Sequence, residues 1–355
     1  MYRTETSGGA QWTLIVTSAP SAPRRRIIHM RKSLTMASVA VLATSLAACS
    51  STGGRKAVEE ASNNAGHANT PTMTVALVTH SGPGDTFWDI VRKGAEDAAA
   101  KDNVKLEYTS DPDGSKQSNL VQQAVDKKVD GIALTLAKPD AMKGSVEAAK
   151  KAGIPVVALN GGLDDWKKMG VESYFGQDEK IAGEAAGDKL KSGGAKKVLC
   201  VIHEQGNVGH VDRCAGVKSK FDATENIYVN GTDMPSVQSA ITSKLQQDKT
   251  IDAVLGLGGP YAMAATKSVK DASSDAKVYT FDTSNEVLGA IKAGTIQWAV
   301  DQQPYLQGYL AVDSLWLRKN NGNIVGGGEP VLTGPAFIDK SNVADVEKYA
   351  KSGRR

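Results

Sequence analysis

The segment GDTFWD places two aromatic residues, Phe87 and Trp88, directly after a glycine-rich turn, in a chain of which only 5% of residues are aromatic. A flat aromatic ring can lie against the apolar face of a small molecule, and a carboxylate such as that of Asp85 can accept hydrogen bonds from it. Core packing is the alternative role for an adjacent aromatic pair. The elements that position these side chains decide between the two roles.

Short β-branched runs alternate with longer helical stretches from Thr72 onward. The runs TVALV, VKLEYT, GIALTL and IPVVALN are typical of strands, and residues 86–101, 115–128 and 139–152 between them are predicted helices. Continuous apolar strands separated by helices predict a parallel sheet that is covered on both faces.

The same pattern returns about 122 residues later in the chain. His80 and His203 follow matching strands, and an aspartate comes 50 residues later in the first copy and 49 in the second. A further 30 residues lead to Asn160 in one copy and Asp282 in the other. Ligands bind outside the carboxyl ends of parallel strands, so the loop 80–88, Asn160, the segment 203–213 and Asp282 should surround one cleft.

The first 48 residues have the layout of an export signal. Basic residues precede a mostly apolar stretch at 34–48, which is too short to span a bilayer. Residues 46–49 resemble the lipobox of bacterial lipoproteins, so we expect cleavage after residue 48 and lipid attachment at Cys49, with an ordinary signal peptide as the alternative. Met30 is an alternative start, because the leader from there to residue 48 is already complete.

Removing this leader changes the charge of the chain. Residues 1–48 hold six Lys or Arg and one acidic residue, so the formal charge falls from +3 to −2. This value gives no support to a nucleic-acid partner. No later apolar run reaches the length of a membrane helix, so we expect a soluble body. A flexible tether at 49–72 and the lipid would hold it on the outer face of the bacterial cytoplasmic membrane.

The paired halves, the lipobox, the polar tether and the fragments FW, RCAG, FD and DQQP together resemble the periplasmic sugar-binding proteins of the ribose-binding type, which feed ATP-binding-cassette importers. The resemblance covers roughly residues 73–340. It implies a type I periplasmic binding fold of class α/β, with two doubly wound parallel-sheet lobes joined by a three-segment hinge. The implied N-terminal lobe is 73–176 plus 303–331, and the C-terminal lobe is 177–302 plus 332–355.

The resemblance also implies roles for residues of the first half. Phe87 and Trp88 match the adjacent aromatics that stack on the sugar in this family. Asp85 stands where ribose-binding relatives have an asparagine that bonds a hydroxyl, with a helix N-cap as the alternative. Asn160 matches a hydroxyl acceptor, and a turn residue is its alternative role.

In the second half, Arg213 of HVDRCAG matches the family's R-x-x-G, in which the arginine reaches the sugar and the glycine lets helix and strand approach. A surface salt bridge is the alternative for this arginine. Asp282 matches a carboxylate that bonds two hydroxyls, and we expect Arg213 to partner it. Gln302 of VDQQP matches the hinge segment V-x-Q-x-P and should contact the ligand, while Asp301 and Gln303 point elsewhere.

Three departures from the family pattern argue against ribose itself. Gly161 replaces an arginine, residues 258–260 replace polar side chains by Gly-Gly-Pro, and the loop 81–84 is about two residues longer. A different pentose, a tetritol or pentitol, or a cyclitol fits equally well.

Two cysteines remain in a compartment where thiols oxidise, Cys200 in a predicted strand and Cys214 in the following helix. Such elements pack together in an α/β unit, so a disulfide is geometrically possible, and two buried free thiols are the alternative.

The resemblance implies that ligand capture closes the lobes, and that the membrane permease subunits of the importer recognise the closed form. Hinge connections are expected near 175–177, 283–285 and 302–304. We expect a monomer that binds a simple sugar or polyol. A module that reports a small molecule to a sensor kinase is the alternative.

Other classes find little support. His80, His203 and His210 lie near predicted strand ends beside Glu204, but no H-E-x-x-H or G-x-S-x-G motif accompanies them, so we expect no catalysis, metal or cofactor. GLGGPY leaves the dinucleotide motif incomplete and follows the wrong strand. No basic helix-turn-helix precedes residue 73, which excludes the repressors of this fold.

Overall fold

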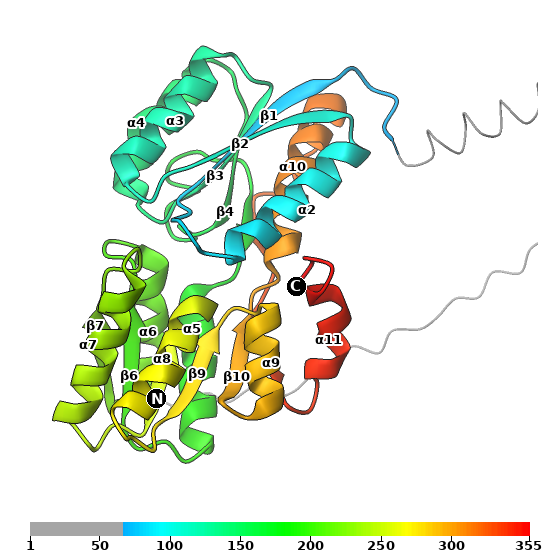
Figure 1. Ribbon diagram of the computed structural model, residues 1–355. Helices are drawn as coiled ribbons and strands as arrows, with labels where there is room; N and C mark the ends of the chain where they lie inside the picture. Colours follow the sequence, from blue (N-terminus) through cyan, green and yellow to red (C-terminus); the bar gives the residue numbers. More distant parts are fainter. Residues whose placement is uncertain (1–66) are drawn as a thin grey trace, which may run out of the picture. The chain divides into compact units, whose positions relative to one another are not determined.

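Two six-stranded sheets form the core of the protein in a computed structural model, which describes residues 67–355 (Figure 1). The predicted signal peptide, the lipidation site Cys49 and residues 50–66 of the predicted tether lie outside the described residues. Within 67–355, no helix is both long enough and apolar enough to cross a membrane.

The first sheet is entirely parallel, and its strands are β1 (Met73–Thr79), β2 (Val104–Ser110), β3 (Gly131–Thr135), β4 (Val156–Asn160), β5 (Tyr174–Gly176) and β11 (Val331–Leu332). Their order across the sheet is β11-β5-β4-β3-β1-β2. The second sheet contains β6 (Val198–Ile202), β7 (Thr224–Tyr228), β8 (Ala253–Gly256), β9 (Lys277–Phe281), β10 (Ile296–Asp301) and β12 (Ala336–Asp339). Its order is β12-β10-β9-β8-β6-β7, and only β12 runs antiparallel to its neighbour.

Helices cover both faces of the first sheet, which we call the first lobe together with these helices. One face carries α2 (Phe87–Lys101) and α10 (Pro304–Asn321), and the other carries α3 (Gly114–Asp126) and α4 (Pro139–Lys151). The alternation of side chains along β1 explains this, since Val75 and Leu77 pack with the first pair and Ala76 and Val78 with the second.

The second sheet and its helices form the second lobe by the same rule. One face carries α5 (Glu179–Ser192) and α6 (Val208–Lys220), and the other carries α7 (Met234–Gln247), α8 (Gly259–Asp271), α9 (Asn285–Ala293) and α11 (Val343–Ala350). Cys200 and Ile202 of β6 pack on the first face, and Leu199 and Val201 on the second. The two helix-covered sheets confirm the predicted α/β fold class.

The chain passes between the sheets at three places. It crosses after β5 at 177–178, after β10 at 302–303, and between β11 and β12 at 333–335. The first two crossings agree with the predicted connections. The predicted connection at 283–285 is wrong, because β9 before it and β10 after it both belong to the second sheet.

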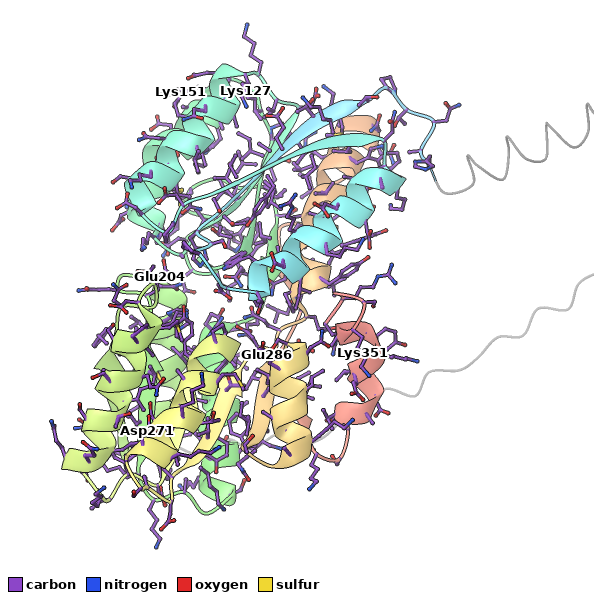
Figure 2. The ribbon with its side chains drawn as sticks, in the orientation of Figure 1. Lys127, Lys151, Glu204, Asp271, Glu286 and Lys351 are labelled. Atoms are coloured by element: carbon purple, nitrogen blue, oxygen red, sulfur yellow. A yellow bond between two sulfur atoms is a disulfide. The ribbon has the colours of Figure 1, made fainter. Side chains whose placement is uncertain are left out.

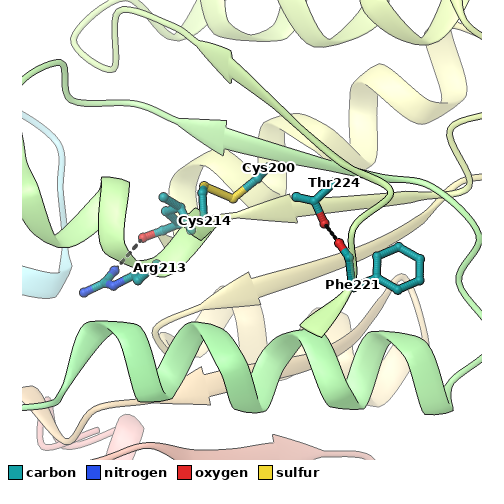
Figure 3. The surroundings of a disulfide bond; sticks show 6 residues. Cys200, Arg213, Cys214, Phe221 and Thr224 are labelled. Atoms are coloured by element: carbon teal, nitrogen blue, oxygen red, sulfur yellow. Dashed lines mark hydrogen bonds between the residues drawn. A yellow bond between two sulfur atoms is a disulfide. The ribbon is translucent and has the colours of Figure 1, made fainter. Parts of the chain in front are cut away.

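A disulfide joins Cys200 of β6 to Cys214 of α6, with an S–S distance of 1.97 Å and a Cα–Cα distance of 6.0 Å (Figure 3). Both cysteines are fully buried. The bond fixes α6 against the sheet beside Arg213, which is the residue before Cys214 in the chain. The oxidised pair is therefore also a support for the candidate site.

Candidate functional site

A cavity of about 490 Å³ lies between the two lobes, where loops that follow the carboxyl ends of strands in both sheets meet. We call it the interlobe cavity. All seven predicted site residues line it: Asp85, Phe87, Trp88, Asn160, Arg213, Asp282 and Gln302. Contact of these side chains with a ligand stays a prediction.

Phe87 and Trp88 open helix α2 and are both core and cavity residues. They are buried, they pack in the core between the first sheet and α2, and they line the interlobe cavity. Their ring centroids are 5.0 Å apart with an interplanar angle of 83°, and Trp88 also meets the ring of His80 at 4.7 Å. The two roles weighed for the pair are therefore compatible.

Asp85 holds the start of this helix without being its N-cap residue. Its Oδ1 accepts a hydrogen bond from the backbone N–H of Phe87 at 3.1 Å, while the cap residue Thr86 makes no capping bond with its side chain. Burial raises the pKa of Asp85 to about 6, against the opposing effect of the hydrogen bond from Phe87. The carboxyl group is therefore poised to change charge just below neutral pH.

Gln302 links the polar residues that follow matched strands of the two lobes. Asn160 Nδ2 donates to Gln302 Oε1 at 3.1 Å, and Gln302 Nε2 donates to Asp282 Oδ1 at 2.7 Å. Sequence reasoning missed Gln307, whose Nε2 also donates to Gln302 Oε1 at 3.1 Å. This buried amide network sits where the chain passes from the second lobe to the first.

Asn160 and Asp282 share an uncommon backbone conformation, since both have φ of 68°. Asparagine and aspartate tolerate this left-handed region better than other residues with a Cβ. The two matched positions of the sequence repeat therefore share a backbone conformation as well. Each places one polar side chain of its lobe at the cavity.

The hydrogen-bond partner of Arg213 is Glu179 and not Asp282, so the expected pair of Arg213 and Asp282 is limited to the effect of the arginine's charge, which lowers the pKa of Asp282. Arg213 Nε donates to Glu179 Oε2 at 2.5 Å, and Nη2 donates to Oε1 at 2.8 Å. Nη1 donates to the carbonyl oxygen of Leu257 at 3.3 Å. Both charged side chains are buried, which also differs from a surface salt bridge. Glu179 is the first residue of α5, and its neighbour Asp178 caps that helix.

Glycines at the contact between α5 and α6 make this pair possible. A Cβ on Gly216 would meet the backbone carbonyl oxygen of Lys180, and one on Gly183 would meet the carbonyl oxygen of Arg213. The glycine of R-x-x-G thus lets two helices approach, whereas the prediction was the approach of a helix and a strand. Close packing brings the carboxylate of α5 to the guanidinium of α6.

Burial raises the pKa of Asp282 to about 7, and the charge of Arg213 and the hydrogen bond from Gln302 only partly oppose this effect. A buried carboxyl group is easier to ionise when hydroxyl groups donate hydrogen bonds to it. Asp282 is therefore suited to receive such bonds from a polyhydroxylated molecule.

Each cationic side chain that lines the interlobe cavity has an acidic partner. Arg213 pairs with Glu179, and Lys138 Nζ lies 2.8 Å from Glu204 Oε1. The lining in the described residues contains no other lysine or arginine. A phosphate or carboxylate would find no uncompensated cation here, so the lining argues against an anionic ligand.

Contacts across the cavity mouth join the lobes directly. Lys138, which precedes α4 of the first lobe, pairs with Glu204, which follows β6 of the second and lies at the end of that lobe facing the first (Figure 2). The backbone N–H of Val208 donates to the carbonyl oxygen of Ala137 at 3.0 Å. We call these two contacts the interlobe latch.

Three histidines also line the cavity: His80, His203 and His210. Within residues 67–355, no group of three or more His, Cys, Asp or Glu side chains is arranged to hold a metal ion. Burial is the main cause that lowers the pKa of all three histidines. From the sequence, no catalytic or metal-binding role is expected for them; in the structure His80 follows β1, His203 follows β6 and His210 lies in α6.

Comparisons with known proteins agree with this architecture. The family model described as periplasmic binding protein domain matches residues 75–322. The ribose import binding protein RbsB of Bacillus subtilis is 26% identical over 269 residues, which cover 71% of this chain and 83% of that protein. The D-apiose import binding protein of Paraburkholderia graminis is 27% identical over 256 residues, with coverages of 68% and 78%.

Among solved structures, a carbohydrate transporter from Acidothermus cellulolyticus 11B in complex with myo-inositol matches with a TM-score of 0.79. It is 55% identical, and the match covers 80% of this chain and 100% of that chain. The family match and this similarity confirm the resemblance noted in the sequence. The chain belongs to the periplasmic binding protein domain family.

Proposed function

We propose that the protein is the substrate-binding component of an ATP-binding-cassette importer, and that it captures one uncharged cyclic polyol of the inositol class. The main support for this proposal is the charge balance of the interlobe cavity, in which Arg213 and Lys138 are both neutralised by acidic partners. The carboxyl groups of Asp85 and Asp282 and the amides of Asn160 and Gln302 then serve hydroxyl groups.

The relatives support both the class of protein and the class of ligand. The ribose and D-apiose proteins are import binding proteins by name, which favours binding over catalysis. The structure that is 55% identical to this chain contains myo-inositol. A cyclitol has a C–H face for Trp88 or Phe87 and hydroxyl groups around its rim, so it satisfies the same mixture of side chains.

Capture would work by closure of the lobes. A ligand that touches Trp88 on the first lobe and Asp282 on the second binds the closed form more tightly than the open form, so it shifts the population toward closure. The proposed rigid bodies are the predicted lobes, 73–176 with 303–331 and 177–302 with 332–355, except that Leu332 pairs in the first sheet and moves with the first body. We further propose a monomer that Cys49 anchors by lipid to the outer face of the cytoplasmic membrane, where permease subunits receive the closed form.

A thermal-shift panel at millimolar ligand concentration tests the ligand class. The neutral arm contains myo-inositol, scyllo-inositol, xylitol, erythritol, D-ribose and D-xylose, and the charged arm contains glucuronate, glucosamine and inositol 1-phosphate. Ligand at about 1,000 times its dissociation constant stabilises by about 4 kcal/mol, which raises the melting temperature by several degrees.

We expect a shift with an inositol and none in the charged arm. A shift with a pentose alone would mean that the ligand is that pentose and not a cyclitol. A shift with glucosamine, glucuronate or the phosphate would overturn the uncharged ligand class, and no shift at all would overturn the proposed function.

A further inference from the structure

The second-lobe wall of the interlobe cavity contains two imidazole rings, those of His203 and His210. His203 follows β6, and His210 lies in the first turn of α6, whose cap residue Asn207 accepts a bond from the backbone N–H of His210 at 3.3 Å. The two ring centroids are 4.2 Å apart. His203 also stacks on Tyr261, with 3.6 Å between centroids and an interplanar angle of 15°.

Packing explains why glycine fits at position 258, where the family pattern has a polar side chain. A Cβ on Gly258 would lie 3.2 Å from the ring of Tyr261 and 3.4 Å from Cε1 of His203. The stacked rings therefore take the space that a polar side chain from Gly258 would need.

The Nδ1 atoms of His203 and His210 are enclosed by the protein on the side away from the cavity, and within residues 67–355 neither has a hydrogen-bond partner. The His210 side chain is 5% exposed and lines the cavity. The Nε2 atoms are not among the enclosed atoms and also make no hydrogen bond within residues 67–355, so they are the ring nitrogens that a ligand in the cavity can reach. A polar atom at a cavity wall without a protein partner is suited to bond a ligand. His80 differs, because both of its ring nitrogens have partners: Nδ1 lies 2.7 Å from Thr135 Oγ1, and Nε2 lies 3.4 Å from Asn207 Nδ2.

The charge state of the two rings suits a hydroxyl group. Burial and the charge of Arg213 lower the pKa of both well below the usual range, so each ring is neutral near pH 7. A neutral imidazole has one N–H donor and one nitrogen acceptor. A hydroxyl group can both donate and accept, so it bonds to either tautomer.

We propose that His203 and His210 are specificity-determining residues that hydrogen-bond to two neighbouring hydroxyl groups of the ligand. This inference rests on the polyol-binding function proposed above. In this proposal, the wall of the second lobe bonds hydroxyl groups of the ligand that Phe87 and Trp88 of the first lobe do not contact.

The test uses binding of myo-inositol and of a set of monodeoxy myo-inositols, measured by calorimetry. The variants are His203→Phe and His210→Phe, which keep a ring but remove its nitrogens, and the matched control is His67→Phe, at an exposed histidine outside the cavity. Each cavity variant should bind myo-inositol about 10-fold more weakly. For the wild type, removing one particular hydroxyl group from myo-inositol should lower the affinity by about the same factor. In the variant that lacks the histidine facing this hydroxyl group, removing the same hydroxyl should lower the affinity less than about twofold.

Equal binding of myo-inositol by the wild type and both variants would overturn the inference while leaving the proposed function intact. If each variant loses the same affinity for every deoxy analogue, the inference is also overturned, because no ring would then be paired with a particular hydroxyl group. Failure of the wild type to bind any neutral polyol would overturn the proposed function and the inference with it.

If either Phe variant fails to fold, nitrogen-15 imidazole spectra of the wild type decide the question. With myo-inositol, the Nε2 signals of His203 and His210 should shift, and one deoxy analogue should leave one of them unshifted. Spectra of the two rings that are identical for all analogues would contradict the proposal.

Discussion

Asp282 couples recognition of a hydroxyl group to the gain and loss of a proton. Burial raises its pKa to about 7, while Arg213 and the hydrogen bond from Gln302 favour the ionised form. Asp85 and Glu179 are the acidic groups whose charges raise it further. Hydroxyl donors from a ligand would act in the same direction as Arg213 and lower this pKa.

Affinity for myo-inositol should therefore rise between pH 5 and pH 8, because below about pH 7 binding must release a proton from Asp282. Calorimetry in buffers of different ionisation enthalpy measures this release. In Asp282→Asn only the smaller contribution of Asp85, with its pKa of about 6, should remain. An affinity that does not change over this range would contradict the coupling.

The same group makes the stability of the protein depend on pH in the absence of ligand. Its folded pKa of about 7 exceeds the ordinary 3.8, so its contribution is fully present below about pH 4 and is lost as the pH rises through about 7. Asp282→Asn should thus gain stability relative to wild type as the pH rises from 4 to 8, on the order of 2–4 kcal/mol. Urea unfolding at each pH measures the difference, and a constant difference would show that the carboxyl group does not titrate with folding.

At the scale of helices and strands, the repeat was the most informative part of the sequence. The matched aspartates at 130 and 252 accept backbone N–H bonds in both lobes, from Thr74 in the first and from Lys196 and Lys197 in the second. The predicted helices at 86–101, 115–128 and 139–152 agree with α2, α3 and α4 within two residues. Spacing and apolar periodicity carry such information because both arise within one βα unit.

Partners on separate helices could not be read in this way. The pair of Arg213 and Glu179 depends on the approach of α5 and α6, which is a tertiary fact. The polar run at 283–285 suggested a connection, but Ser284 accepts a bond from the N–H of Val287 and caps α9. Polar residues that cap a helix and those of a hinge have the same local composition.

Gly216→Ala should destabilise the second lobe, because its added Cβ would collide with the backbone of α5. We expect a loss of about 1–3 kcal/mol in unfolding free energy and weaker binding of myo-inositol, since Arg213 and Glu179 would separate. Gly289→Ala is the control, since nothing lies within 4 Å of its Cβ position in α9. Equal denaturation midpoints for the two variants would contradict the packing argument.

The disulfide should support both the fold and the site. Cys200 and Cys214 are 14 positions apart, and a loop of this size gives about 3 kcal/mol in the chain-entropy model. The double variant Cys200→Ser, Cys214→Ser should lose about that much stability and bind myo-inositol less tightly. Chemical denaturation under oxidising conditions measures the loss, and wild-type stability in the double variant would exclude a supporting role.

At the scale of the whole molecule, the interlobe latch adds to the closure that a ligand drives. Lys138 and Glu204 come from different lobes, and their side chains are 22% and 17% exposed, so the pair is only partly screened by solvent. Such a contact stabilises the closed form in the absence of ligand. It would therefore raise the fraction of molecules that are ready to bind.

Lys138→Met should open the ligand-free protein, increase its radius of gyration in X-ray solution scattering, and weaken myo-inositol binding about fivefold. At saturating ligand the scattering should match that of wild type. Lys127→Met is the matched control, because Lys127 pairs with Glu107 on the surface of the first lobe alone (Figure 2). If the two variants scatter alike without ligand, the latch does not hold the lobes together.

Titration of the purified protein with myo-inositol in a calorimeter, with Asp282→Ala and Trp88→Ala in parallel, tests directly whether the interlobe cavity binds a cyclitol. We predict one binding site per chain and a loss of about 10-fold or more in affinity in each variant, because one removes the hydroxyl acceptor and the other the aromatic surface. Tight binding that neither variant changes would contradict the site. Absence of heat with myo-inositol and with every neutral sugar and polyol of the panel would contradict the function.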